Sequence, residues 1–491
     1  MSKRAKNLVV IGIFILSMAL VLLILILTQP KENAGEDISS SSTVSVLSYD
    51  RDNIASMKIT NDRGEYVIRN GVQGFTIDEY SEFRQNTTTM AAAGRCATNI
   101  TAQALAEENA ENLEKYGLAD GSPKASCEVT LKDGTVYTVC FGINAPDGST
   151  RYFRLADSHD VYTVLLNSSG YFYYAEDDFI SLSVTDELTN NNTAPTIDHL
   201  LITRKDLDYD IEFVDDSKNY SIDEISMASA QVMISPVYAY LDITNSNAII
   251  YGLWGLTAID VVKVHPTEED FAQYGLDDPF CTVDLEAELQ KYAMRIGNVA
   301  EYQLDENGDP TTVPVAFYCY YEGIDIIYIF DTTEVPWATF MPIDILSSMM
   351  TSNYIYALDY IDINYYAPDA ANYYFDLDGH IEETYLTGTL NGNEIDPDEF
   401  KILYQFMLKC PIDDLCFEDP QEDKLIARID FRRDDGTGDI LEFYDQGNNR
   451  VAIKLNGIIS FSQPRGYLTV LQQNIEAFAN GATGDELQQV W

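Results

Sequence analysis

Residues 113–120 read LEKYGLAD, and residues 271–279 repeat the pattern as FAQYGLDDP. In both places the sequence predicts the end of a helix. Gly117 or Gly275 can take the left-handed conformation just past the last helical turn, the leucine that follows packs back on that turn, and a nearby proline prevents the helix from continuing. The repeated stop therefore predicts two copies of one structural unit.

The residues on either side of each stop extend the repeat. Residues 102–116 are rich in Ala, Glu and Leu and predict a helix, and Thr267 can cap a shorter helix over residues 268–274. After each stop, alternating apolar and polar residues predict a β-hairpin that ends at a glycine. These hairpins cover residues 125–141 before Gly142 and residues 282–296 before Gly297.

Hairpin patterns also open the two copies, at residues 54–69 and 200–214. A third, more degenerate unit follows. It has the alternating apolar and polar residues of strands and two helical patterns, but it lacks the Tyr-Gly-Leu stop. Its predicted elements are two strands in residues 373–386 around a turn at Asp378 and Gly379, a helix at 397–408, strands in 426–455 and a closing helix at 467–479.

An apolar run without charge covers residues 8–27 and follows Lys3, Arg4 and Lys6. As an α-helix, this run would be about 30 Å long, which is the thickness of the hydrocarbon core of a membrane. No A-x-A-like cleavage pattern follows it. An uncleaved transmembrane anchor is therefore favoured over a cleaved signal peptide. Because basic residues precede the run, the positive-inside tendency places the N-terminus in the cytosol. The predicted location is the cell membrane, crossed once, with an extracytoplasmic C-terminal ectodomain.

Together these patterns predict an α+β fold. It has predominantly antiparallel β-hairpins with intervening helices, in two clear and one degenerate tandem repeat, plus one N-terminal transmembrane helix. A polar stretch with four consecutive serines behind the apolar run predicts a tether. The predicted segments are a cytoplasmic basic head at residues 1–7, a transmembrane helix at 8–27, a flexible tether at 28–43, and three α+β modules at 44–190, 195–345 and 355–480.

The charge balance narrows the possible partners. The chain has 30 Lys and Arg against 79 Asp and Glu, a formal net charge of −49 at pH 7. Such a surface repels phosphate backbones, so we expect no nucleic-acid ligand. Solubility outside the cell explains the acidity most simply, and the alternative is binding of cations or of a basic partner protein. Because 12% of the residues are aromatic and the acids are dispersed among apolar residues, we expect the ectodomain to fold.

The seven cysteines indicate a structural role. No C-x-x-C pair occurs in the sequence and the four histidines are scattered, so the spacing that zinc and thioredoxin-like sites require is missing. Several cysteines lie in apolar, strand-like runs, where a free thiol behaves as a small hydrophobe. We expect buried thiols with at most one disulfide, between Cys410 and Cys416.

No common catalytic signature occurs in the sequence: it lacks a phosphate-binding loop, a G-x-S-x-G elbow, an S-x-x-K pair and an H-E-x-x-H helix. The acidic clusters at 206–210 and 376–379 lack the required positions of an EF-hand loop and predict turns, and 301–309 predicts a loop. We expect exposed polar side chains rather than general bases at His159, His199, His265 and His380. We therefore predict no catalytic, cofactor-binding or metal-binding residue, and no cofactor.

The first copy has a family resemblance. Its Tyr-Gly-Leu stop and proline are followed by the hairpin VTLKDGTVY at residues 129–137, then a glycine, then the strand patterns at 151–165. This order resembles the bacterial family called domain of unknown function 4340, best over residues 54–166. The second copy departs through an insertion at 302–313 and lacks the Lys-Asp-Gly turn. The resemblance implies one N-terminal membrane span and a location near ABC-type export systems similar to the gliding-motility type.

Three functional hypotheses follow. The first is a non-enzymatic binding or scaffold protein, or an accessory subunit of an ABC-type export system whose partners are the permease and its ATPase. The second is a cell-wall or polysaccharide-binding protein, since clusters among the 33 tyrosines could line a glycan groove, although cross-strand packing explains them more simply. The third is a carboxylate-based envelope hydrolase, whose two acids the sequence does not locate.

Overall fold

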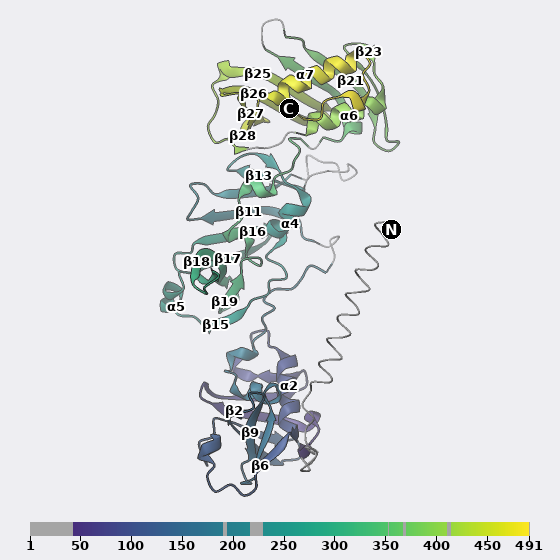
Figure 1. Cartoon of the computed structure of the whole chain (residues 1–491). Coiled ribbons are helices and arrows are strands. Elements are labelled where there is room, and N and C mark those ends of the chain that lie inside the picture. Colours follow the sequence, from purple (N-terminus) through teal and green to yellow (C-terminus); the bar gives the residue numbers. More distant parts are fainter. Residues whose placement is uncertain are drawn as a thin grey trace, which may run out of the picture. The chain divides into compact units, whose positions relative to one another are not determined.

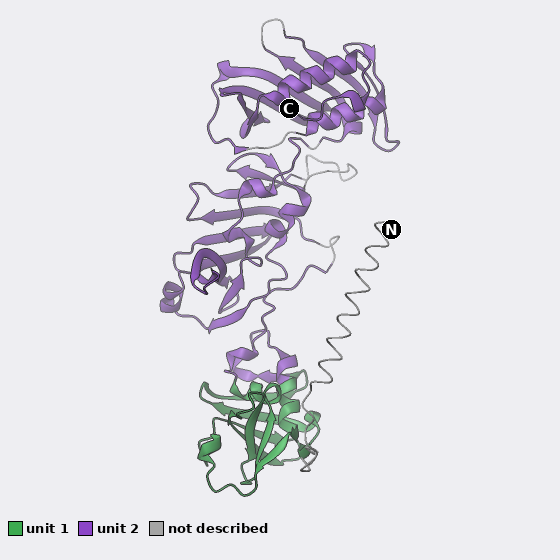
Figure 2. Ribbon diagram, in the orientation of Figure 1, with its two compact units in different colours: residues 1–74, 91–173 green, residues 75–90, 174–491 purple. Residues whose placement is uncertain are grey.

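The computed structural model describes residues 43–189, 194–216, 229–351, 353–366, 370–409 and 414–490. These residues belong to two compact units, which Figure 2 shows in different colours. Unit 1 lies within residues 1–74 and 91–173, and unit 2 lies within residues 75–90 and 174–491. Antiparallel strands dominate in both units.

One strand order recurs in the three large sheets (Figure 1). In each sheet two meanders start from a central antiparallel pair of strands and extend in opposite directions. In each sheet, one strand comes between the two meanders in the amino-acid sequence. This strand pairs at the outer edge of the second meander. Because neighbouring strands within a meander are antiparallel, short turns are enough to connect them.

The strands of these sheets have the following bounds. The first sheet has the order β4 (Gly74–Ile77), β3 (Gly64–Gly71), β2 (Ile54–Asn61), β7 (Ala125–Leu131), β8 (Val136–Asn144), β9 (Thr150–Leu155), β10 (Val161–Leu165) and β6 (Ala104–Glu107). The second has β14 (Ala239–Tyr240), β13 (Gln231–Ser235), β12 (Ile211–Asp215), β11 (Ile197–Arg204), β16 (Cys281–Ala287), β17 (Gln290–Leu304), β18 (Pro310–Tyr321), β19 (Ile326–Asp331) and β15 (Asp260–Val264). The third has β23 (Asn393–Glu394), β22 (Tyr385–Leu390), β21 (Tyr373–His380), β20 (Leu358–Tyr365), β25 (Leu425–Arg433), β26 (Gly438–Gly447), β27 (Arg450–Leu455), β28 (Ile458–Pro464) and β24 (Asp414–Leu415). A separate two-stranded sheet pairs β1 (Val44–Ser48) with β5 (Asn99–Ala102).

Short helices lie between the strands. The described α-helices are α2 (Thr87–Thr98), α3 (Leu166–Ser169), α4 (Ile243–Tyr251), α5 (Glu268–Gln273), α6 (Pro397–Leu408) and α7 (Gly466–Ala479). Helices α6 and α7 lie across one face of the third sheet (Figure 1), where Phe400 packs on Phe375 and Tyr467 on Phe443, with ring centroids 5.1 and 6.0 Å apart. The helices predicted from Thr267 onward, at 397–408 and at 467–479 are confirmed to within about one residue.

The predicted α+β fold class is wrong. The described residues form four antiparallel sheets, and the helices are short additions to them. No α-helix is present over residues 102–116, which form the end of β5, then β6, then a 3₁₀ helix at Glu114–Tyr116. The alanine-rich part pairs with β10 instead, because strand pairing overrides helix propensity.

No helix among the described residues is long and apolar enough to cross a membrane. The predicted span at 8–27 lies outside those residues, as does the predicted tether apart from Thr43. A further correction concerns Asp378 and Gly379, which lie inside β21 and pair with β22. The turn is formed by residues 381–384, because the alternating burial of β21 continues through the Asp-Gly pair.

The repeated stop has the geometry predicted from its sequence. Gly117 and Gly275 have φ angles of 68° and 70°. The backbone N–H of the next residue, Leu118 or Leu276, donates to a carbonyl in the preceding turn, at 3.0 and 2.8 Å. Both leucines are fully buried. These features define a Schellman motif, which satisfies carbonyls that a helix end leaves without partners.

The glycine predicted to end each following hairpin lies inside β8 or β17 and has a matching role. A Cβ atom on Gly142 would lie 2.0 Å from the carbonyl oxygen of Tyr116, and one on Gly297 would lie 2.3 Å from that of Tyr274. The stop therefore packs directly on the backbone of β8 or β17. Each tyrosine ring also packs on a tyrosine of the next strand, with centroids 4.6 Å apart in both copies.

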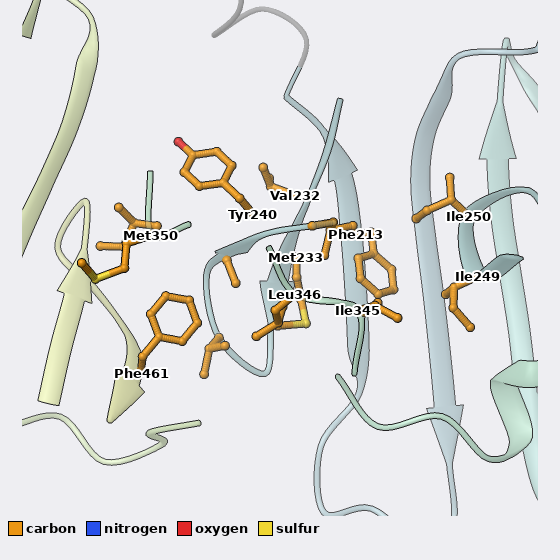
Figure 3. Close-up of a cluster of buried hydrophobic side chains, with 14 of the residues drawn as sticks. Phe213, Val232, Met233, Tyr240, Ile249, Ile250, Ile345, Leu346, Met350 and Phe461 are labelled. Atoms are coloured by element: carbon orange, nitrogen blue, oxygen red, sulfur yellow. The ribbon is translucent and has the colours of Figure 1, made fainter. Parts of the chain in front are cut away.

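In unit 2 the apolar core continues from the second sheet to the third (Figure 3). Phe213 and Met233 belong to the second sheet, and Phe461 belongs to β28 of the third. Leu346 of the connecting segment lies between them, and Met350 of the same segment lies beside Phe461. All five side chains are at most 8% exposed, so the two sheets share one core.

Candidate functional site

The described part of unit 2 contains a cleft of about 460 Å³ beside the turn between β18 and β19. Segments that are distant in sequence line it: residues 82–84, residues 181, 183 and 184, and residues 323–325. His265 and Tyr328 complete the lining. We call this hollow the His265 cleft.

The imidazole of His265 lies between two carboxylates. Its Nδ1 is 2.8 Å from Asp325 Oδ2, and its Nε2 is 3.3 Å from Glu82 Oε1. A neutral imidazole has one N–H and can donate to only one carboxylate at a time, whereas the imidazolium donates to both. The ring of Phe83 lies beside the imidazole, with centroids 5.3 Å apart.

The backbone of His265 has a conformation that is uncommon for its residue type. Its φ is 50°, in the left-handed region, and Pro266 follows it. This conformation costs a residue with a side chain about 1–2 kcal/mol. The backbone N–H of His265 donates to the carbonyl of Asp325 at 3.0 Å, which ties the bend to the β18–β19 turn. The bend leads the chain from β15 to Thr267, which caps α5.

An arginine and apolar side chains form the rest of the cleft. Arg84 Nη2 lies 2.7 Å from Asp186 Oδ1, and Arg84 Nη1 donates to the Ser183 hydroxyl at 3.4 Å. Val184 and Tyr328 are buried, and burial raises the pKa of the Tyr328 phenol to about 12. The phenol therefore stays protonated near neutral pH and contributes apolar ring surface.

The arrangement at His265 differs from that of a catalytic triad. The pair Asp325–His265 resembles the orienting half of a Ser-His-Asp triad, but Glu82 lies where a triad has its nucleophile. The Ser183 hydroxyl interacts with Arg84 instead. The side chains of His265, Glu82 and Asp325 are 53%, 50% and 53% exposed, so all three are open to solvent.

The other histidines lie elsewhere. His199 Nε2 is 2.6 Å from Glu212 Oε1 in the second sheet, and His380 Nε2 is 3.7 Å from Asp378 Oδ1 in the third. His159 is exposed. Among the described residues, no group of three or more His, Cys, Asp or Glu is placed to hold a metal ion.

The acidic clusters stabilise local structure. Arg204 Nη2 lies 2.6 Å from Asp206 Oδ2. Asp305 lies at the tip of the β17–β18 hairpin, where its carboxylate accepts the backbone N–H groups of Asp309 and Asn307 at 3.0 and 2.8 Å. These bonds lower the pKa of Asp305.

The insertion in the second copy lengthens a hairpin, because β17 and β18 continue into it.

The six cysteines that the structure describes have free thiols, and five of them are buried, as predicted. Burial raises the pKa of the Cys281 thiol to about 12 and that of Cys319 well above its usual value. Such thiols are poor nucleophiles, because the thiolate is the reactive form. Cys410, the predicted partner of Cys416, lies outside the described residues.

The sequence of this chain matches a known family over part of its length. Residues 76–224 match the family model described as Domain of unknown function (DUF4340). This segment is similar to the DUF4340 family. The DUF4340 match contains the first Tyr-Gly-Leu stop and confirms the resemblance seen there; it includes Glu82 and Ser183 of the cleft and ends before His265. No curated protein and no solved structure matches the chain.

Proposed function

We propose that this protein is a non-enzymatic binding or scaffold protein on the outer side of a bacterial membrane, where it serves an ABC-type export system. The arrangement at His265 supports binding over catalysis, because both ring nitrogens face carboxylates rather than a hydroxyl or thiol. The apolar run at residues 8–27 behind Lys3, Arg4 and Lys6 supports attachment to the membrane with the N-terminus inside. The family resemblance supports the link to an export system.

Crosslinking in native membranes tests this proposal. The tagged full-length chain is purified after crosslinking, and its partners are identified by mass spectrometry. Recovery of a permease together with its ATPase supports the accessory role. Recovery of no protein partner contradicts the proposal. An unrelated tagged membrane protein of similar abundance controls for nonspecific crosslinks.

Polysaccharide binding is the second candidate function, and exposed tyrosines on the third sheet favour it. The rings of Tyr360 and Tyr374 on neighbouring strands stack with centroids 5.5 Å apart, and Tyr374 and Tyr385 are 43% and 52% exposed. Tyrosines in such a position offer apolar ring faces with polar tips, which suits a sugar surface. Retention on purified peptidoglycan that is lost in a Tyr374→Ala, Tyr385→Ala variant supports this function. Clearing in a zymogram favours an envelope hydrolase instead.

A further inference from the structure

We infer that the His265 cleft is the docking site for a Lys or Arg side chain on a segment of a partner protein. This inference deepens the proposed binding function and rests on it. Glu82 and Asp325 bind the cationic head of the side chain. Phe83 and Tyr328 contact its aliphatic part.

The charge of the cleft is the first argument. Glu82 and Asp325 approach one imidazole at 3.3 and 2.8 Å, and a neutral ring can satisfy only one of them. Arg84 pairs with Asp186 at 2.7 Å, so its charge is already neutralised. Two carboxylates therefore face at most one positive charge on the imidazole, and a cation from a partner would offset the remaining negative charge. The formal net charge of −49 attracts basic partners over a longer range.

The size and lining of the cleft are the second argument. Its volume of about 460 Å³ lies within the roughly 300–1,000 Å³ of typical ligand sites and exceeds what a single ion fills. Phe83 and Tyr328 supply aromatic surface, which attracts ammonium and guanidinium groups. The methylene stem of Lys or Arg packs favourably on such apolar walls while its charged end stays hydrated. A bare metal ion would leave these walls without contacts.

Peptide binding to the full-length protein in detergent tests the inference. Fluorescence anisotropy compares a fluorescein-labelled peptide of Arg, Gly and Ser with a peptide in which Glu replaces Arg. We expect saturable binding of the Arg peptide alone, and about tenfold weaker binding to the Glu82→Gln, Asp325→Asn double variant. Asp359→Asn removes an exposed acid of the third sheet and serves as the matched control, with unchanged affinity. Equal affinity of the double variant and the unaltered protein would overturn the inference.

A second measurement avoids dependence on the folding of the variant. Carbodiimide modification of the unaltered protein is mapped by mass spectrometry with and without the Arg peptide. We expect protection at Glu82 and Asp325 but not at Asp359, and a lack of protection overturns the inference. The proposed function fails separately, when membrane crosslinking of the unaltered chain recovers no partner. If the unaltered chain and the double variant recover the same partner in the same amount, that result contradicts the docking site but not the proposed function.

Discussion

The hydroxyl of Tyr240 donates a 2.8 Å hydrogen bond to Oδ1 of Asp439, a residue 199 positions away. Tyr240 lies in β14 of the second sheet and Asp439 in β26 of the third, and both are buried. The side-chain amides of Asn353 and Asn456 donate to the same carboxylate at 2.9 and 2.8 Å. Because a buried carboxylate requires such partners, this cluster joins the two sheets through polar contacts in addition to their shared apolar core.

Removing the tyrosine hydroxyl should weaken this junction. Tyr240→Phe leaves the buried Asp439 carboxylate with one donor fewer, and we expect the free energy of unfolding to fall by about 1–3 kcal/mol. Urea denaturation followed by fluorescence measures the change. Tyr366→Phe is the matched control, because Tyr366 is 53% exposed, and it should change stability by less than about 0.5 kcal/mol. Equal stability of the two variants contradicts a stabilising role for the hydrogen bond.

The glycines on which the two stops pack should not tolerate a side chain. The new Cβ lies 2.0 Å from the Tyr116 carbonyl oxygen in Gly142→Ala and 2.3 Å from that of Tyr274 in Gly297→Ala. Backbone must move in each variant, so we expect losses of about 1–3 kcal/mol, typical of overpacking. Gly170→Ala is the control, because a Cβ there has no neighbour within 4 Å. Thermal unfolding compares the three, and equal melting temperatures refute the packing argument.

Local rules explain which elements the sequence predicted correctly. The stop, the hairpins and the cap at Thr267 depend on residues within a few positions of one another. The crossing strands β6, β15 and β24 are different, because each is defined by pairing at a distant sheet edge. Residues 102–116 show the limit of local rules. Their composition favours a helix, yet Ala104 and Leu105 pair with β10.

Two arginines show that a repeated contact can arise from positions that do not correspond in sequence. Arg154 Nε donates to the Leu118 carbonyl at 3.3 Å, and Arg295 Nη1 donates to the Leu276 carbonyl at 3.5 Å. The second meander of the first sheet begins at β7, and that of the second sheet begins at β16. Arg154 lies in the third strand of its meander (β9), whereas Arg295 lies in the second strand of its meander (β17). An alignment of the two copies therefore does not match these arginines, although both support the same leucine carbonyl.

The His265 cleft was not predicted for a related reason. Its histidine and two carboxylates come from three distant segments, so no spacing rule connects them. The local signal was a His-Pro pair between a strand and a helix cap, which indicates a bend. A bend of this kind becomes a candidate site only when the fold brings Glu82 and Asp325 to it.

Glu176 gives a prediction for the pH dependence of stability. Partial burial raises its pKa above the usual 4.5, and the negative charges of Glu79 and Asp177 add to this effect. The ionised carboxylate is thus less favourable in the folded chain than in the unfolded chain. Ionisation of Glu176 therefore lowers the free energy of unfolding as the pH rises above about 4.5. At lower pH the group is protonated in both states and has no such effect. Glu176→Gln should raise the melting temperature by about 1–3 °C near pH 7.5 and leave it unchanged near pH 3.5. The control Glu382→Gln, at an exposed turn, should have no effect. An equal gain at both pH values contradicts the charge explanation.

Thiol reactivity should follow burial. Cys127, Cys281 and Cys319 are 0% exposed, whereas Cys96 is only partly buried. Burial raises the pKa of all four thiols. Because alkylation requires an accessible thiolate, iodoacetamide should label Cys96 in the folded chain and the other three only after denaturation. Timed alkylation without reductant, read by peptide mass spectrometry, measures each rate, and Cys96→Ser should remove only the early label. Labelling of Cys281 as fast as Cys96 contradicts its buried environment, and fewer than five free thiols in the denatured chain contradict the limit of one disulfide.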